Sequence, residues 1–229
     1  RLSDFEGEQP EIDFDSLLDA TVTLYQSQER GSLRVTGGDP AFSDFVEGIQ
    51  MTVFTQTSEF GAPSPMSRYT RTWLRDNVGS LLANLWLGRQ RQAIAQIDYL
   101  WGGLCWAGDF KNNFPADLEF VSPWPPDWDS LGPLETRVGA ETPSYVVIMH
   151  GLIAAYAGEL DRLAERWPML RRAMFDLRFD DDYRLPFTGD ETFRTALSAA
   201  TGLPLAHAYE DEEYSLNSQL LWLAAERQF

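Results

Sequence analysis

Apolar residues recur at intervals of three and four along much of the chain, which is the spacing of one face of an α-helix. The first such segment covers residues 42–54, and a second covers about 71–87. A third covers about 90–104 and follows the second after only a few residues. Two helices joined so tightly are predicted to pack as an antiparallel hairpin.

The second half of the chain also predicts helices, first a nearly all-apolar one and then an amphipathic one. Residues 144–157 are nearly all apolar, which predicts a helix buried on most sides. An amphipathic helix is expected over 160–177, where Pro168 should kink or split it. Its arginines, expected on the wet side, are Arg162, Arg166, Arg171 and Arg172. We expect a shorter helix at 189–200 and a last helix from about 215. Buried and amphipathic helices thus alternate along the chain, which predicts nested helical hairpins whose inner helices are buried on both sides.

Two other segments depart from the helical pattern. Short β-prone runs at 21–25 and 32–35 predict a β-hairpin or two edge strands. We therefore divide the chain into an N-terminal extension with short strands, 1–40, and a helical domain, 41–229. Residues 105–143 are expected to form a long irregular loop, a feature that is often functional.

Composition and charge narrow the class of protein. A chain of 229 residues with 44% hydrophobic residues can bury a large core. The net charge of −17 argues against a partner made of nucleic acid and against binding to an anionic membrane. No apolar run is long enough to cross a membrane. Cys105 is the only cysteine and there are two histidines, so we expect no metal site, and without a glycine-rich nucleotide loop we expect no cofactor.

Carboxyl groups at predicted helix starts are the first candidates for chemistry. Arg75 and Asp76 follow Trp73, and this pair can hold sugar hydroxyls because aspartate accepts hydrogens while arginine donates in a fixed fork. Glu141 ends the long loop just before the buried helix and would face a cavity at the helix N-termini. Helix capping and surface ion pairing remain the alternative interpretation of these residues.

A second candidate is the segment from Leu185 to Thr192. Asp190 and Glu191 follow an apolar Pro-Phe pair, and apolar surroundings raise the pKa of a carboxylic acid so that it can serve as a general acid. The alternative is again helix capping, with Asp190 as the N-cap.

Tryptophans in the long loop form the third candidate. Trp106, Trp124 and Trp128 lie among Asp and Asn residues, and their flat apolar rings suit the faces of sugar rings. They could equally anchor the loop in a small core. His150 is expected to be a core histidine and Cys105 a small buried apolar residue.

Four motifs in a fixed order resemble one known family. They are Trp-Leu-Arg-Asp-Asn at 73–77, Glu-Thr-Pro-Ser-Tyr at 141–145, Leu-Pro-Phe-Thr-Gly-Asp-Glu-Thr at 185–192 and Tyr-Ser-Leu-Asn-Ser at 214–218. Over about residues 40–229 the chain resembles the six-hairpin glycosidases. This is the (α/α)6 toroid clan, which includes glucoamylases and the maltose and kojibiose phosphorylases. The fold prediction is therefore all-α, part of such a toroid, with a short N-terminal β-hairpin.

The resemblance implies roles for the candidate residues. Arg75 and Asp76 would hold the sugar in the deepest subsite, with Trp73 and Asp190 also binding substrate, and Glu191 would protonate the glycosidic oxygen. Glu141 would be a second wall residue or the acid itself. Many of these enzymes invert configuration, using a water activated by a second carboxylate, or a phosphate in its place.

The predicted function is an inverting glycoside hydrolase acting on a small oligosaccharide. Two alternatives stay open: a disaccharide phosphorylase of the same fold, and a non-catalytic sugar-binding or scaffold domain. The pattern predicts fewer helices than six hairpins need, and its last helix runs uncapped to Phe229. We therefore expect the remaining helices, and the catalytic base, to belong to a longer polypeptide.

Overall fold

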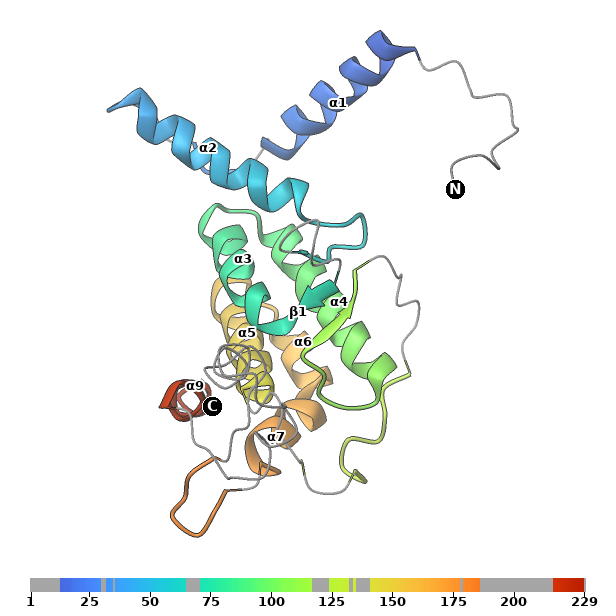
Figure 1. Ribbon diagram of the computed structural model, residues 1–229, viewed down its shortest axis with the longest axis vertical. Helices are drawn as coiled ribbons and strands as arrows, with labels where there is room; N and C mark the ends of the chain where they lie inside the picture. The colour runs from blue at the N-terminus through green and yellow to red at the C-terminus, as the bar shows by residue number, and fades with distance from the viewer. Residues whose placement is uncertain are drawn as a thin grey trace, which may run out of the picture.

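The computed structural model describes residues 13–29, 32–34, 36–64, 71–116, 124–131, 134, 141–177, 179–185 and 216–228. These residues are predominantly helical, with one small antiparallel sheet of two strands (Figure 1). The prediction of a mainly helical protein is therefore confirmed. The elements are α1 (Phe14–Glu29), α2 (Pro40–Thr55), β1 (Arg71–Trp73), α3 (Leu74–Trp86), α4 (Gln90–Ala107), β2 (Asn113–Pro115), α5 (Thr142–Ala157), α6 (Leu160–Glu165), α7 (Trp167–Phe175) and α9 (Leu216–Glu226). The helix predicted at 189–200 lies outside the described residues.

The β-hairpin predicted within residues 21–35 is wrong. Its first half lies inside helix α1, and the described residues of its second half form no strand. The carboxylate of Asp13 caps α1 by accepting from the backbone N–H of Ser16. Within the helix the hydroxyl of Thr21 donates to the carbonyl of Leu17. The side chain of this β-branched residue therefore has a hydrogen-bond partner inside the helix. Local capping and helical spacing therefore override β-propensity here.

Helix α2 confirms the helix predicted at 42–54. Asp39 accepts a hydrogen bond from the backbone N–H of Ala41, and Pro40 occupies the first turn, where its missing N–H costs nothing. Tyr25 of α1 meets Phe54 of α2 edge to face, with ring centroids 5.4 Å apart. The two helices lie at one end of the structure, away from α7 and α9 (Figure 1).

Helices α3 and α4 form the predicted hairpin. They are joined by residues 87–89, with Gly88 in the left-handed region at φ 75°. A buried polar contact holds the hairpin together, because Nε2 of Gln96 donates to Oδ1 of Asn77 at 2.8 Å and to Oγ of Ser80 at 2.8 Å. This side-chain network satisfies polar groups that would otherwise be costly to bury.

Helix α5 is the centre of the helical core. It packs against α3, α4, α6, α7 and α9, and most of its residues are buried, as its apolar sequence predicts. The helix predicted over 160–177 is split into α6 and α7, and Pro168 lies in the first turn of α7. The predicted effect of Pro168 is thus confirmed.

The small sheet ties the start of α3 to the segment after α4. β1 pairs with β2 in antiparallel register, with Thr72 opposite Phe114 and Trp73 opposite Asn113. Phe114 is fully buried and lies on α4 at Gly103, where an added Cβ would come within 2.7 Å of the ring. This close approach fixes β2, and through it β1, on the surface of α4.

Candidate functional site

The start of α3 is held by backbone and side-chain hydrogen bonds. The N–H of Leu74 donates to the carbonyl of Asn112 at 2.8 Å, and Nδ2 of Asn77 donates to the carbonyl of Trp73 at 2.6 Å. Asp76 lies in the first turn, where a negative charge is favoured by the helix dipole. The sequence motif at 73–77 is therefore fixed in space by the sheet behind it.

The start of α5 is more deeply buried. Glu141 immediately precedes the helix, and its carbonyl accepts the N–H of Tyr145 at 3.0 Å. Pro143 lies in the first turn, and Ser144 is fully buried. Glu141 itself is 3% exposed, an unusual degree of burial for a carboxylate.

Arg75 brings the two helix starts together. Its Nη1 lies 3.8 Å from Oε1 of Glu141, and its Nε lies 3.8 Å from Oδ1 of Asp76. These separations are those of ion pairs rather than hydrogen bonds. The side-chain exposure rises from 4% at Glu141 through 28% at Arg75 to 40% at Asp76. The three residues therefore form a charged cluster that runs from the core to the solvent, and we call it the Arg75 cluster.

Two polar groups lie at these same helix starts without a hydrogen-bond partner in the described part of the chain. They are Nε1 of Trp73, before α3, and Oγ of Ser144, in the first turn of α5. Buried polar groups in proteins are nearly always hydrogen-bonded. The indole N–H of Trp73 and the hydroxyl of Ser144, at the same end of the fold as the Arg75 cluster, are therefore able to form hydrogen bonds with a ligand or water.

The predicted tryptophans lie in three different settings. Trp106 is in the last turn of α4 rather than in a loop, and it is 61% exposed, while Trp124 is 90% exposed. Trp128 is only 3% exposed and packs against Trp101 and Phe110, with ring centroids 6.2 and 5.8 Å apart. Trp128 therefore anchors its loop in the core, and its faces are not open to a sugar.

Asp190 and Glu191 lie outside the described residues. The described part of the predicted site is therefore Trp73, Arg75, Asp76, Glu141 and the three tryptophans. Of these, the structure brings Arg75, Asp76 and Glu141 into one cluster.

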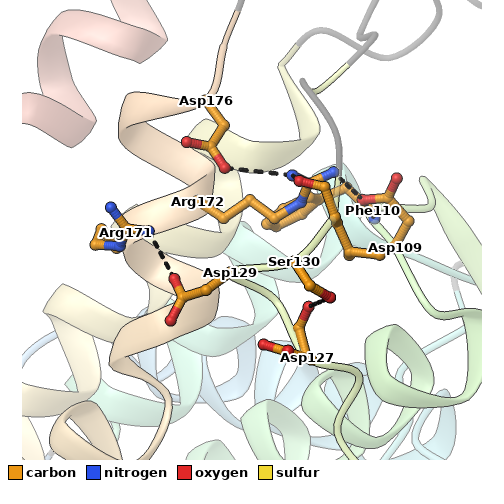
Figure 2. Close-up of polar contacts among 9 residues, drawn as sticks. Asp109, Phe110, Asp127, Asp129, Ser130, Arg171, Arg172 and Asp176 are labelled. Carbon is orange, nitrogen blue, oxygen red and sulfur yellow. Dashed lines mark hydrogen bonds and ion pairs between the residues drawn. The ribbon is translucent and has the colours of Figure 1, made fainter.

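Two arginines expected on the wet side of the amphipathic helix are buried. Arg172 is 2% exposed and pairs with Asp109 at 3.5 Å and with Asp176 at 3.3 Å (Figure 2). Its neighbour Arg171 is exposed as expected and donates to Asp129 at 2.6 Å. Arg172 ties α7 to the segment after α4, because a buried guanidinium needs carboxylates or carbonyls brought to it from elsewhere in the fold.

The second buried arginine is Arg166, between α6 and α7. It forms a hydrogen-bonded ion pair with Asp98 of α4, and its guanidinium carbon lies 5.2 Å from the ring centroid of Trp101. Its Nη1 is 3.4 Å from Nε2 of His150, whose Nδ1 contacts the carbonyl of Val146. The ion pair with Asp98 of α4 thus explains why Arg166, predicted to be exposed, is buried.

Two buried titratable side chains near Arg166, His150 and Cys105, are held in their neutral forms. Burial, with the charge of Arg166 adding to it, lowers the pKa of His150 to about 3. Burial raises the pKa of the Cys105 thiol to about 12. His150 is the expected core histidine, and Cys105 is the expected buried apolar residue, so neither is suited to act as a base or nucleophile at neutral pH.

A pocket of about 420 Å³ lies beside the sheet, at the end of α4. Its lining residues are Arg71, Trp106, Ala107, Lys111, Asn112 and Asn113. The hydrogen bond from Leu74 to Asn112 links one wall of this pocket to the start of α3. Of these residues the sequence singles out only Trp106. Arg71 precedes α3 and Lys111 follows α4, so that both line this pocket is known only from the fold.

Comparisons of the chain with protein-family models, with characterised proteins and with solved structures find no match. Among the described residues, no group of three or more His, Cys, Asp or Glu side chains is placed to hold a metal ion. None of the described helices is long and apolar enough to span a membrane.

Proposed function

We propose that the protein is an inverting glycoside hydrolase that acts on a small oligosaccharide. The observation that carries the proposal is the Arg75 cluster, in which one guanidinium lies 3.8 Å from each of two carboxylates at the starts of α3 and α5. Carboxylates and guanidinium groups are the side chains that bind sugar hydroxyls most directly, since they accept and donate several hydrogen bonds in fixed directions.

Each member of the cluster takes a role that follows from its exposure. Asp76, the most exposed, accepts hydrogens from sugar hydroxyls, and Arg75 donates to the sugar oxygens. Glu141, the most buried of the three, lies 3.8 Å from Arg75 and is assigned the role of a wall residue of the sugar site. The general acid is then Glu191, the role that the resemblance to the six-hairpin glycosidases implies.

The helix arrangement supports the same proposal. In the (α/α)6 toroid that we propose, α3 and α5 would be inner helices and α4, α6 and α7 outer ones; in keeping with this, α5 packs against α3, α4, α6 and α7. In such a ring the inner helices present their ends to the substrate. The Arg75 cluster lies at two such ends.

Sugar binding is tested first, because it does not depend on a complete catalytic apparatus. We expect a panel of mono- and disaccharides to contain one that raises the melting temperature saturably, by an amount that corresponds to about 2.7 kcal/mol at 100 times its Kd. Asp76→Ala should abolish that shift. The matched control is Asp161→Ala, because Asp161 is also an exposed acid in the first turn of a helix, α6. If no sugar shifts the melting temperature, or if both variants behave alike, the sugar site is not at Asp76.

Turnover tests the assignment of the acid. With a sugar identified, Glu191→Gln should reduce hydrolysis by about 10²- to 10⁴-fold, the contribution of a general acid. A loss of only a few-fold would refute this role. Products measured with and without phosphate separate the two reactions of this fold, since a sugar phosphate would contradict hydrolysis and support phosphorolysis.

A further inference from the structure

The pocket beside the sheet differs in charge from the rest of the chain. The protein carries a net charge of −17, and its sequence contains a single lysine, Lys111. That lysine and Arg71 both line the pocket, and none of the described lining residues carries a carboxylate. A pocket with two cations in so acidic a protein attracts an anion locally while the remaining surface repels it.

The acidic residue nearest to Lys111 in the sequence is directed elsewhere. Asp109 lies 3.5 Å from the buried guanidinium of Arg172, on the side of the segment that faces α7 (Figure 2). Arg71 is oriented by a hydrogen bond from its Nε to Oδ1 of Asn113. The hydrogen bond to Asn113 thus orients one cation, and Asp109, the acidic residue nearest to Lys111 in the sequence, is paired with Arg172.

The other walls of the pocket suit a sugar ring. Trp106 is 61% exposed at the end of α4, and an indole face packs well on the apolar face of a pyranose. The amide groups of Asn112 and Asn113 can both donate and accept, which matches ring hydroxyls. A volume of about 420 Å³ is enough for one sugar residue.

We propose that this pocket binds an acidic sugar residue, a uronic acid whose carboxylate meets Arg71 and Lys111 while its ring lies on Trp106. The proposal rests on the proposed function, because it makes the pocket a subsite for the charged end of a substrate whose scissile end is held at the Arg75 cluster. The hydrogen bond between Leu74 and Asn112 joins the two sites through the backbone. The substrate class is then an acidic oligosaccharide rather than a neutral one.

Calorimetric titration with three small probes tests the two halves of this proposal separately. Glucuronate supplies ring and charge, glucose supplies the ring alone, and acetate supplies the charge alone. We expect glucuronate to bind at least about tenfold more tightly than either, since a charge-assisted hydrogen bond is roughly twice as strong as a neutral one. Raising the salt from about 0.01 M to about 0.15 M, which shortens the Debye length from ~30 to ~8 Å, should weaken glucuronate binding and leave glucose unaffected.

Substitutions locate the bound anion. Lys111→Gln should weaken glucuronate binding roughly three- to tenfold, while Lys111→Arg should keep most of the affinity. The matched control is Arg227→Gln, which removes the same charge from an exposed residue just after α9. Because Lys111 is the only lysine of the sequence, reductive methylation followed by mass spectrometry also reports on it alone among the side chains, and glucuronate should slow its modification.

The outcomes separate this inference from the proposed function. Equal affinities for glucuronate and glucose, no binding of glucuronate, or an unchanged affinity in Lys111→Gln would each overturn the acidic-sugar pocket, whatever the protein hydrolyses. Binding of glucuronate that depends on Lys111, with no hydrolysis of any glycoside, would keep the pocket and refute the hydrolase. Asp161→Ala should leave glucuronate binding at the pocket within about twofold, because Asp161 lies in the first turn of α6 and is not among the described residues that line the pocket.

Discussion

Among the glycines that the structure describes, Gly103 of α4 is the one at which an added methyl group should have the largest consequence. Helix α4 has no side chain there, and the ring of Phe114 lies directly against the helix in the resulting space. A Cβ at Gly103 would come within 2.7, 2.8 and 2.9 Å of three ring carbons of Phe114. Phe114 is fully buried, so its ring cannot move aside into solvent. We therefore predict that Gly103→Ala forces a shift of β2 or of the helix.

The change in the free energy of unfolding caused by Gly103→Ala is the sum of two opposing effects. Overpacking a well-packed core costs about 1–3 kcal/mol. Replacing glycine by alanine inside a helix contributes about 1 kcal/mol in the other direction. The second effect can be measured separately at Gly79 of α3, which is also inside a helix but has no atom within 4 Å of an added Cβ. The free energies of unfolding of the two variants should therefore differ by the overpacking cost alone, about 1–3 kcal/mol.

Thermal or urea unfolding followed by circular dichroism measures this difference. For a chain of this size 1 kcal/mol corresponds to about 2–4 °C, so Gly103→Ala should melt roughly 2–12 °C below Gly79→Ala. Gly79→Ala should itself melt at or slightly above the wild type. Combining Gly103→Ala with Phe114→Leu should recover part of the loss, because the smaller side chain vacates the space. If the two alanine variants are equally stable, the close packing of β2 on α4 is refuted.

Two further predictions concern buried ionisable side chains, the charged Arg172 and the neutral His150. Arg172→Met should lower the free energy of unfolding by about 1–3 kcal/mol, because it removes charged hydrogen bonds at a 2% exposed guanidinium. The control, Arg171→Ala at the exposed neighbour, should leave the urea midpoint nearly unchanged, and equal losses would contradict the burial of Arg172. Because burial lowers the pKa of His150 to about 3 from its ordinary value of 6.5, the unfolded chain binds the proton first, and stability should fall as the pH decreases from 6.5 towards 3. Urea unfolding at several pH values should show a shallower loss for His150→Gln, and an identical pH dependence would contradict a neutral buried histidine.

The helices could be predicted because their signals are local. Apolar residues at helical spacing and the break at Pro168 each depend on neighbours within a few residues. The β-hairpin predicted near the N-terminus is wrong for an equally local reason, because the cap at Asp13 and the hydrogen bond of Thr21 within α1 outweigh the β-propensity of residues 21–25. The strands β1 and β2 could not be predicted, because three residues are too few to display an alternating pattern.

The residues of the candidate site could be predicted, and the resemblance implies that they share one site, but the ion pairs that join them could not be predicted. Arg75, Asp76 and Glu141 stand out in the sequence because each charge begins an apolar helix. That Arg75 reaches Glu141 depends on α3 and α5 packing side by side with their starts at the same end. The burial of Arg166 and Arg172 was missed for a related reason, because their partners, Asp98 and Asp109, come from distant parts of the chain.

The lengths of the connections explain why the polar groups gather at one end of the helices. α3 is joined to α4 by residues 87–89, and α5 is joined to α6 by residues 158–159, so both turns lie at the ends of α3 and α5 opposite the Arg75 cluster. The connection that follows α4 pairs, through β2, with β1 at the other end, where α3 and α5 begin. The charged cluster itself lies on first helical turns, whose geometry is set by core packing, while Lys111 and Asn112 lie on the connection. We therefore expect substitutions at Arg75 or Glu141 to change whether a sugar binds, and substitutions in the connection to change which sugar is preferred.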